Sequence, residues 1–165
     1  MPNIKSFGTC LWFDTQAEDA ANFYCSIFPN SKITNTSRYS EAGTEIHGKR
    51  SGTVMTVVFT LDGHQFTALN GGPQFKFSEA ISFIVDCETQ ADIDYFWNRL
   101  SEGMPANSGQ CGWLKDKFGV SWQVVPASLP QIIGGSDNAG RERAMNALLK
   151  MKKLDIAKLK EAYNG

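Results

Sequence analysis

The chain has 165 residues, of which 42 % are hydrophobic and 20 % charged, as expected for a globular protein with one core or two small lobes. Its formal net charge of −1 and its short basic runs argue against nucleic-acid binding. No apolar run reaches the roughly 18 residues of a membrane span, and the first residues lack the apolar core of a secretion signal. With four cysteines and no C-x-x-C pair, we expect free thiols in a cytoplasmic protein that has no membrane partner.

An internal repeat is the main architectural signal of this sequence. Three residues have counterparts 72 positions later (86 − 14, 95 − 23 and 96 − 24): Asp14, Phe23 and Tyr24 match Asp86, Tyr95 and Phe96. Each stretch begins with an apolar run and then passes through polar residues into an amphipathic helix. The repeat predicts two similar units that pack together, and the seam between such units is a natural ligand site.

The first stretch predicts a strand, a helix and a second strand. Residues 4–13 are rich in aromatic and branched side chains, which is typical of a buried strand. Thr15 and Glu18 have capping-box spacing ahead of a helix over 16–28, whose apolar residues recur on one face. A more polar strand is expected over 31–40.

A polar loop with several glycines, 40–52, leads into a hairpin. The branched run 54–61 predicts a strand, and 65–70 is expected to return as its partner. Asp62–Gly63 predicts the tight turn between them, because glycine accepts the positive φ that such turns require. The first unit therefore spans about residues 3–73.

The second stretch, about residues 74–126, repeats this order. A strand is expected over 79–85. Thr89 and Asp92 again have capping-box spacing, and the apolar stripe of a helix follows them. The remaining strands, a weak edge strand and a last hairpin, are expected over 104–110, 111–115 and 120–125.

Each unit is thus interpreted as β-α-β-β-β. The predicted fold class is α+β: residues 1–126 hold the paired units, which form a cupped mixed sheet with helices outside. A C-terminal helical extension, 127–165, has no counterpart in the first unit. Asp137–Asn138 and Asp155 are candidate helix caps within it. We expect this extension to pack on the outside or to reach a partner subunit.

The paired units resemble the vicinal oxygen chelate superfamily, which includes glyoxalase, bleomycin-resistance and extradiol-dioxygenase proteins. Three stretches are similar, more specifically, to its PhnB-like branch, whose members often carry the label 3-demethylubiquinone-9 3-methyltransferase: 68–77 (ALNGGPQFKF), 111–123 (CGWLKDKFGVSWQ) and 148–156 (LLKMKKLDI). The resemblance implies that two cups enclose a small-molecule cavity. It also implies a homodimer, with the C-terminal extension as a candidate contact.

Metal-dependent members of this superfamily place ligands on the first and last strands of each unit. The matching positions in this chain are Phe7, Thr67, Glu79 and Gln123. Of these, Glu79 alone is a good ligand, whereas a divalent metal normally takes three or more protein donors. We therefore expect no metal and no other cofactor. A divalent metal stays the open alternative, because a register shift of one residue would turn each strand's side chains to the other face.

Glu79 is the sharpest catalytic candidate, as a base or hydrogen-bond acceptor whose pKa would be raised if the side chain were enclosed. An exposed carboxylate at the start of a strand is the competing interpretation. His47 and His64 are expected to be solvated. Cys10 and Cys111 lack an evident neighbouring base and are interpreted as buried structural thiols.

Methyl transfer has little support in the glycine pattern. A nucleoside methyl donor is usually held by a glycine-rich turn between a strand and a helix. Gly71–Gly72 is followed by a proline and an aromatic loop, and Gly134–Gly135 precedes no β-α-β unit.

Strand alternation, counted from the four ligand-like positions, predicts the residues of the cavity face. These are Phe7, Thr9, Leu11, Thr67, Leu69, Glu79, Ile81, Phe83, Ser121 and Gln123. An apolar pocket with a few polar groups suits an aromatic or planar organic ligand. The leading hypothesis is a metal-free small-molecule binding protein. The alternative is an enzyme of the same superfamily that uses Glu79 on a small organic substrate, or the methyltransferase that the label names.

Overall fold

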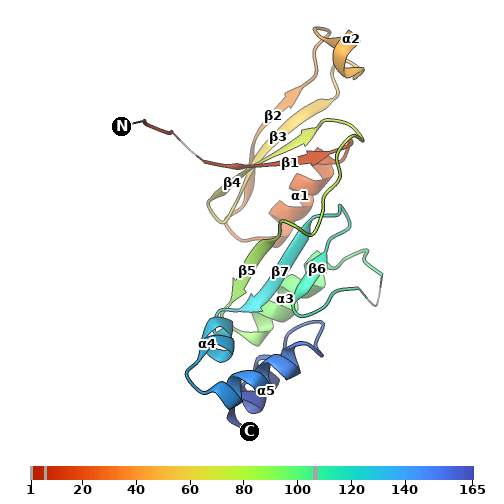
Figure 1. Cartoon of the computed structure of the whole chain (residues 1–165). Helices are drawn as coiled ribbons and strands as arrows, with labels where there is room; N and C mark the ends of the chain where they lie inside the picture. Colours follow the sequence, from red (N-terminus) through yellow and green to blue (C-terminus); the bar gives the residue numbers. More distant parts are fainter. Residues whose placement is uncertain (1, 6, 106–107) are drawn as a thin grey trace. The chain divides into compact units, whose positions relative to one another are not determined.

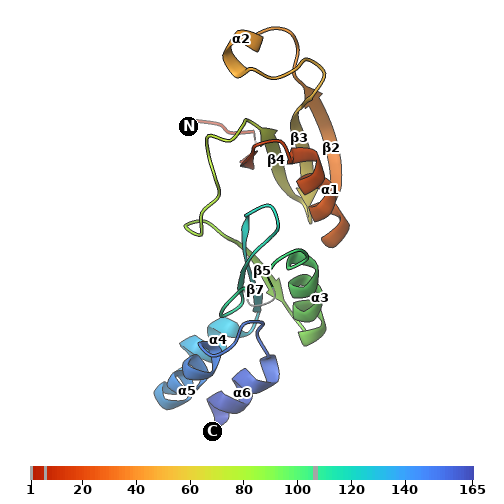
Figure 2. The same cartoon turned by 90° about the vertical axis from the view of Figure 1, so that its right-hand side faces the viewer.

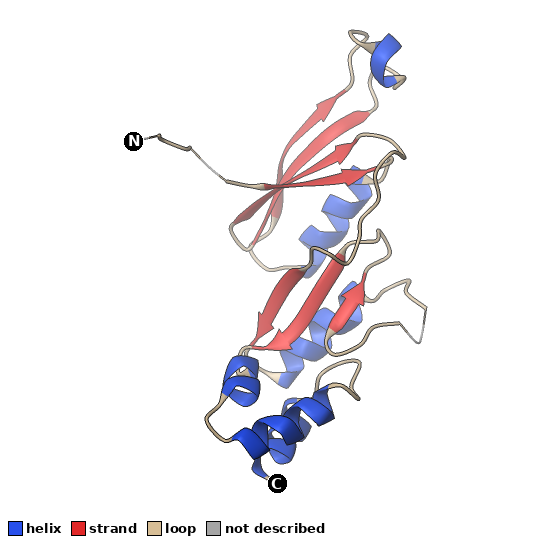
Figure 3. Cartoon of the chain, viewed as in Figure 1, coloured by secondary structure: helices blue, strands red, loops and turns tan. Residues whose placement is uncertain are grey.

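A computed structural model describes residues 2–5, 7–105 and 108–165 of the chain. The chain divides into two compact units, unit 1 (Met1–Phe77) and unit 2 (Ser78–Gly165), and each combines a sheet with helices (Figures 1 and 3). The predicted α+β class is confirmed. In the described part of the chain, no helix is both long and apolar enough to cross a membrane.

The described part of unit 1 holds four strands and two helices. They are β1 (Thr9–Phe13), α1 (Ala17–Ile27), β2 (Lys32–Arg38), α2 (Thr44–His47), β3 (Val54–Leu61) and β4 (His64–Asn70). The sheet order is β1-β4-β3-β2, with β1 parallel to β4 and the other pairs antiparallel. The first strand begins later than predicted, and the loop over 40–52 contains the short helix α2.

Helix α1 covers one face of the unit 1 sheet. Tyr24 of α1 stacks on Phe59 of β3, with 6.2 Å between ring centroids, so Phe59 marks the helix-facing side. Leu11 and Ala68 are register partners on β1 and β4, and both are buried. Ala68 also pairs with Val57, two residues from Phe59, so these apolar side chains form the core beneath the helix.

The start of α1 is held by a residue that is distant in sequence. Thr15 was predicted to cap this helix, but the N-cap is Gln16 and its side chain makes no capping bond. Instead the Ala17 N–H donates to Asn70 Oδ1 at 2.8 Å. Asn70 is buried at the end of β4 and also donates through Nδ2 to the Val54 carbonyl at 3.1 Å. The predicted capping box is therefore wrong in unit 1, because a tertiary contact replaces it.

The described part of unit 2 forms a smaller sheet with order β5-β7-β6. Its strands are β5 (Phe83–Cys87), β6 (Trp113–Lys115) and β7 (Ser121–Pro126), and α3 (Gln90–Leu100) follows β5. β5 runs parallel to β7, as β1 does to β4. Here the predicted capping box is confirmed, because Thr89 and Asp92 exchange side-chain and backbone hydrogen bonds.

The edge strand predicted over 104–110 is not formed by the described residues of that range. Residues 106–107 lie outside the described residues, and the others contribute a single bridge, Gln110 to Trp113. Pro105 has no N–H to donate, and Gly103 and Gly109 have φ values of 82° and 91° that leave the extended region. The strand predicted over 79–85 is also shorter and begins at Phe83.

The C-terminal helices belong to unit 2. They are α4 (Leu129–Gly134), which was not predicted, α5 (Asn138–Leu148) and α6 (Ile156–Asn164), and they gather in Figure 2 beyond the end of β7. Asp137 caps α5 and Asp155 caps α6, as expected. Their apolar side chains form a buried cluster with Val125 of β7.

Candidate functional site

The face of the unit 1 sheet opposite α1 is lined by aromatic, aliphatic and hydroxyl side chains. Register and alternation assign it two rows of partners: Trp12, Leu69, Thr56 and Ser37, and then Cys10, Thr67, Val58 and Asn35. We call these eight residues the unit 1 open face. Ser37 and Thr56 share a hydroxyl hydrogen bond of 2.6 Å across the first row.

Trp12 is fixed at the edge of this face by the loop after β4. Its indole N–H donates to the Gly72 carbonyl at 2.8 Å. The ring meets Phe75 edge-on, with 4.9 Å between centroids. A Cβ at Gly71 would lie 2.1 Å from Trp12 Cζ2, so the ring lies directly against the glycine backbone. The backbone of Gly71–Gly72 therefore packs against the Trp12 ring and accepts its indole N–H.

The corresponding face of unit 2 combines apolar groups with a polar cluster. Ile84, Gln123 and Trp113 are register partners in one row, and Ser121 and Lys115 pair in the next. We call these five residues the unit 2 open face. Ile84 is exposed, and Trp113 keeps 39 % of its surface accessible. These two residues flank Gln123 of the central strand β7, and each offers an apolar surface on which a ring can stack.

Polar groups lie beside this apolar surface. Gln123 donates through Nε2 to Ser82 Oγ at 2.9 Å, and Lys115 forms an ion pair with Glu79. Ser121 is only 3 % exposed, and its hydroxyl has no hydrogen-bond partner among the described residues. Buried hydroxyl groups are normally paired, so this one is a candidate to bind a ligand oxygen or nitrogen.

The predicted cavity residues do not share one face. Thr67, Leu69, Ser121 and Gln123 lie on the open faces. Thr9, Leu11 and Phe83 lie on the helix-facing sides, where their partners are the buried residues Phe66, Ala68 and Trp122. The alternation assumed for the first strands was one residue out of phase, which moves every side chain to the other face.

The three remaining predicted residues precede the strands. Phe7 is 94 % exposed ahead of β1, and Ile81 is 75 % exposed ahead of β5. Glu79 is exposed as well. The prediction missed the other nine residues of the open faces: Cys10, Trp12, Asn35, Ser37, Thr56, Val58, Ile84, Trp113 and Lys115. The assignment of Thr67 on β4 could have placed Cys10 on the same face, because the two residues are partners in the parallel pair of β1 and β4.

The electrostatics of Glu79 differ from the expectation. A hydrogen bond from Lys115, a backbone hydrogen bond and the positive charge of Lys115 lower the pKa of Glu79, whereas enclosure would have raised it. A carboxylate with a lowered pKa that is held in an ion pair is a weak general base.

The histidines and thiols have mainly structural surroundings. His64 is exposed as predicted. His47 is not simply solvated, because its ring packs on Tyr39 with 4.6 Å between centroids and its Nδ1 accepts the Lys49 N–H at 2.9 Å. All four cysteines are free thiols in the described structure, but Cys10 is exposed and Cys111 only partly buried, so the expected full burial is wrong for both. Desolvation raises the pKa of Cys10, so it is not an activated thiolate.

The donor set does not fit the metal centre of the superfamily. Glu79 is engaged by Lys115, while Phe7 and Thr67 carry no carboxylate, imidazole or thiolate. Among the residues that the structure describes, no three histidine, cysteine or acidic side chains form a group that could hold a metal ion. Absence of a cofactor remains a prediction.

Residues 5–125 match the model of a family described as 3-demethylubiquinone-9 3-methyltransferase. This chain belongs to that family. A relative of solved structure from Bacillus cereus, described as a putative 3-demethylubiquinone-9 3-methyltransferase and PhnB protein, is 38 % identical over 74 % of this chain and 100 % of its own, with a TM-score of 0.61. The family resemblance inferred from the sequence is confirmed.

A more distant structure shares the fold. A Pseudomonas aeruginosa protein is 16 % identical over 73 % of this chain and 96 % of its own, with a TM-score of 0.53. The fosfomycin resistance protein FosX from Listeria monocytogenes is 13 % identical over 78 % of this chain and 95 % of its own, with a TM-score of 0.46. No curated protein matches the chain.

The match to the 3-demethylubiquinone-9 3-methyltransferase family includes both open faces. Trp12 and Thr67 of unit 1, and Trp113 and Gln123 of unit 2, all lie within residues 5–125. The match ends before α4, so the C-terminal helices that pack on unit 2 lie outside it.

Proposed function

We propose that this protein binds a small planar organic molecule on the open faces of its sheets, without the metal centre typical of the vicinal oxygen chelate superfamily. One observation carries the proposal. The open faces present indole rings, aliphatic groups, hydroxyls and an amide, whereas metal-dependent relatives would need a set of metal ligands there.

The energetics favour a ligand with an aromatic ring. Trp113 and Ile84 expose apolar surface on either side of Gln123 in one row of the sheet, and covering such surface stabilises a complex by about 25 cal/mol per Å². Gln123 and the buried Ser121 hydroxyl supply directional hydrogen bonds beside that surface. A few polar groups within an apolar surface are typical of small-molecule sites.

Methyl transfer, which the family description names, lacks support from the glycine pairs. Gly71–Gly72 seats the Trp12 ring. Gly135 packs on the Tyr163 hydroxyl, at 2.5 Å from a Cβ placed on the glycine, and follows α4. Neither pair forms the turn between a strand and a helix that holds a nucleoside. Calorimetric titration with the methyl donor S-adenosylmethionine should therefore show no heat of binding.

The decisive experiment is a titration with N-phenyl-1-naphthylamine, an uncharged aromatic dye, followed by its emission. We expect saturable binding that Trp113→Ala weakens about fivefold, because an aromatic pair contributes roughly 0.5–1.5 kcal/mol beyond its area. Tyr95→Ala is the matched control, since Tyr95 is an exposed aromatic residue on α3 and outside both open faces. An equal loss of dye affinity in Trp113→Ala and Tyr95→Ala, or dye binding to the unaltered protein that does not saturate, would overturn the proposal.

A second experiment tests whether ligand binding depends on a bound metal. Dialysis against a chelator should leave the dye affinity unchanged. A stoichiometric divalent metal in the purified protein that disappears in Glu79→Ala would instead support the enzyme alternative.

A further inference from the structure

The structure assigns the C-terminal extension a positioning role: we infer that residues 151–156 hold the turn before β6 and thereby place Trp113 on the unit 2 open face. This inference rests on the proposed function for its consequence in ligand binding. The contacts that carry it lie within unit 2 and can be tested without a ligand.

Trp113 is the last residue of a tight turn with an unfavourable backbone. Gln110 and Trp113 exchange both backbone hydrogen bonds, at 3.0 and 2.8 Å. The two central residues, Cys111 and Gly112, have φ values of 55° and 82°, as in type I′ turns. Glycine accepts this region, but a residue with a Cβ is strained there. The Cys111 conformation therefore needs support from its surroundings.

The extension supplies that support through its backbone. The Cys111 N–H donates to the Met151 carbonyl and the Gly112 N–H donates to the Lys152 carbonyl, both at 2.8 Å. Two consecutive donors of the turn thus meet two consecutive acceptors of the extension. A Cβ at Gly112 would lie 2.9 Å from the Val124 carbonyl oxygen and 3.1 Å from Leu154 Cδ1, so the turn is enclosed between β7 and the extension.

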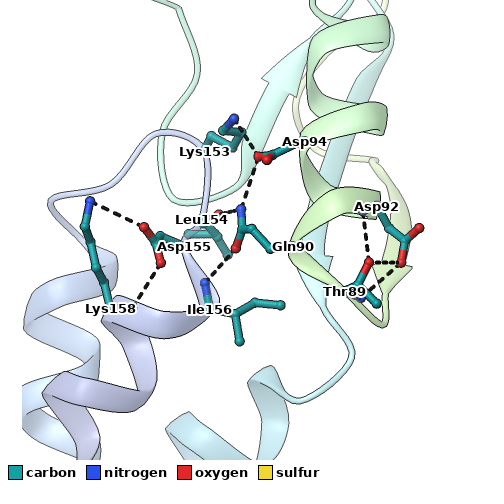
Figure 4. A network of polar contacts seen from close by, with 9 residues as sticks. All are labelled: Thr89, Gln90, Asp92, Asp94, Lys153, Leu154, Asp155, Ile156 and Lys158. Carbon is teal, nitrogen blue, oxygen red and sulfur yellow. Dashed lines mark hydrogen bonds and ion pairs between the residues drawn. The ribbon is translucent and has the colours of Figure 1, made fainter.

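The extension is in turn anchored to α3 by one amide side chain. Gln90 donates through Nε2 to the Leu154 carbonyl at 3.1 Å and accepts the Ile156 N–H through Oε1 at 2.9 Å (Figure 4). Lys153 adds an ion pair with Asp94 at 2.6 Å. Leu154 itself is fully buried in the cluster that contains Val125.

These contacts form a continuous path from Gln90 to Trp113. Gln90 fixes Leu154 and Ile156, the adjoining residues hold Cys111 and Gly112, and Trp113 follows directly. Gln90 is therefore a positioning residue, because it acts on the open face through the extension. Since the family match ends at residue 125, this path adds to unit 2 a support that lies outside the matched region.

The test uses protein labelled with fluorotryptophan, in which the tryptophan signals are assigned by single replacements. Gln90→Ala removes both anchoring bonds, and we expect the Trp113 signal to shift and broaden while the Trp12 signal of unit 1 stays unchanged. Dye affinity should fall about fivefold, within the range of coupling through packed networks. Gln65→Ala, which removes an exposed amide from β4 of unit 1, is the control.

A milder variant keeps the test decisive if Gln90→Ala unfolds unit 2. Gln90→Met keeps the length of the side chain and loses both bonds, so a shift of the same Trp113 signal is expected without a cavity. An unchanged Trp113 signal in these variants would overturn the inference, whether or not amide exchange at Cys111 and Gly112 becomes faster. Failure of the dye to bind the unaltered protein would instead reject the proposed function, and the Trp113 signal would still report the positioning.

Discussion

The two units share one arrangement of strands and a helix but differ in the elements that complete the sheet and cover it. In each, a first strand runs parallel to the last one and a helix covers one face. Unit 1 extends its sheet with β2, whereas the described part of unit 2 lacks that strand and adds α4–α6. A repeat can therefore keep its strand pairing while one copy replaces sheet by helices, provided that the core remains covered.

The hairpins show the same contrast on a smaller scale. Asp62 in the unit 1 turn is exposed and accepts one long bond from Asn30, at 3.3 Å. Asp116 in the unit 2 turn is 4 % exposed. Its carboxylate accepts the N–H groups of Phe118 and Val120 and the Trp122 indole N–H, at 2.9, 3.1 and 2.8 Å. The unit 2 hairpin thus relies on a buried carboxylate, whereas the carboxylate of the unit 1 hairpin is exposed.

Removal of the helical support should give the largest difference between the units. Leu154→Ala creates a cavity in the cluster around Val125 and should cost about 2–5 kcal/mol. Because the contacts of Leu154 described above lie in unit 2, hydrogen exchange should accelerate there and not in unit 1. Leu149→Ala, at a residue that is 53 % exposed, is the control and should change stability by less than about 0.5 kcal/mol. Equal acceleration in both units would contradict the comparison.

The hairpin aspartates provide a matched pair of substitutions. Asp116→Asn keeps an oxygen that can accept the Phe118 and Val120 N–H groups but places an amide donor against the Trp122 indole N–H. A lost hydrogen bond to a charged group costs roughly 1.5–3 kcal/mol. Asp62→Asn should be nearly neutral, because Asp62 is exposed. Urea denaturation of both variants measures the difference. A similar loss of stability in Asp116→Asn and Asp62→Asn would show that the buried Asp116 network does not distinguish the hairpins.

A steric test addresses the seat of Trp12 in unit 1. Gly71→Ala would force the ring away from the backbone, at a cost of about 1–3 kcal/mol. Gly134→Ala is the control, since no described atom lies within 4 Å of a Cβ placed there. Denaturation should separate the two variants, and the near-ultraviolet signal of Trp12 should change only in the first. An unchanged near-ultraviolet signal of Trp12 in Gly71→Ala would mean that the loop after β4 moves to accept the methyl group with little loss of stability.

The sequence predicted helices, strands and caps better than it predicted which sheet face a side chain lies on or which distant residues contact each other. The run 54–61 is a strand over the same residues, and both caps in the C-terminal extension are correct. Alternation separates two faces without saying which one meets the helix, so Leu11 and Phe83 were assigned to the wrong side. The cap from Asn70 to Ala17 spans 53 residues, and no local pattern contains it. The same limit applies to Gln90, whose partners Leu154 and Ile156 are distant in sequence.

The smallest expected effect compares the two helix starts. Thr89→Ala removes a side chain that accepts the Asp92 N–H at 3.2 Å, and losing such a cap costs about 1 kcal/mol. Thr15→Ala should cost almost nothing, because Asn70 already binds the first N–H of α1. Urea denaturation and amide exchange at the first turn of each helix provide the measurement. A loss of stability in Thr15→Ala as large as in Thr89→Ala would show that the two helices start alike and that the Asn70 contact is not a sufficient cap.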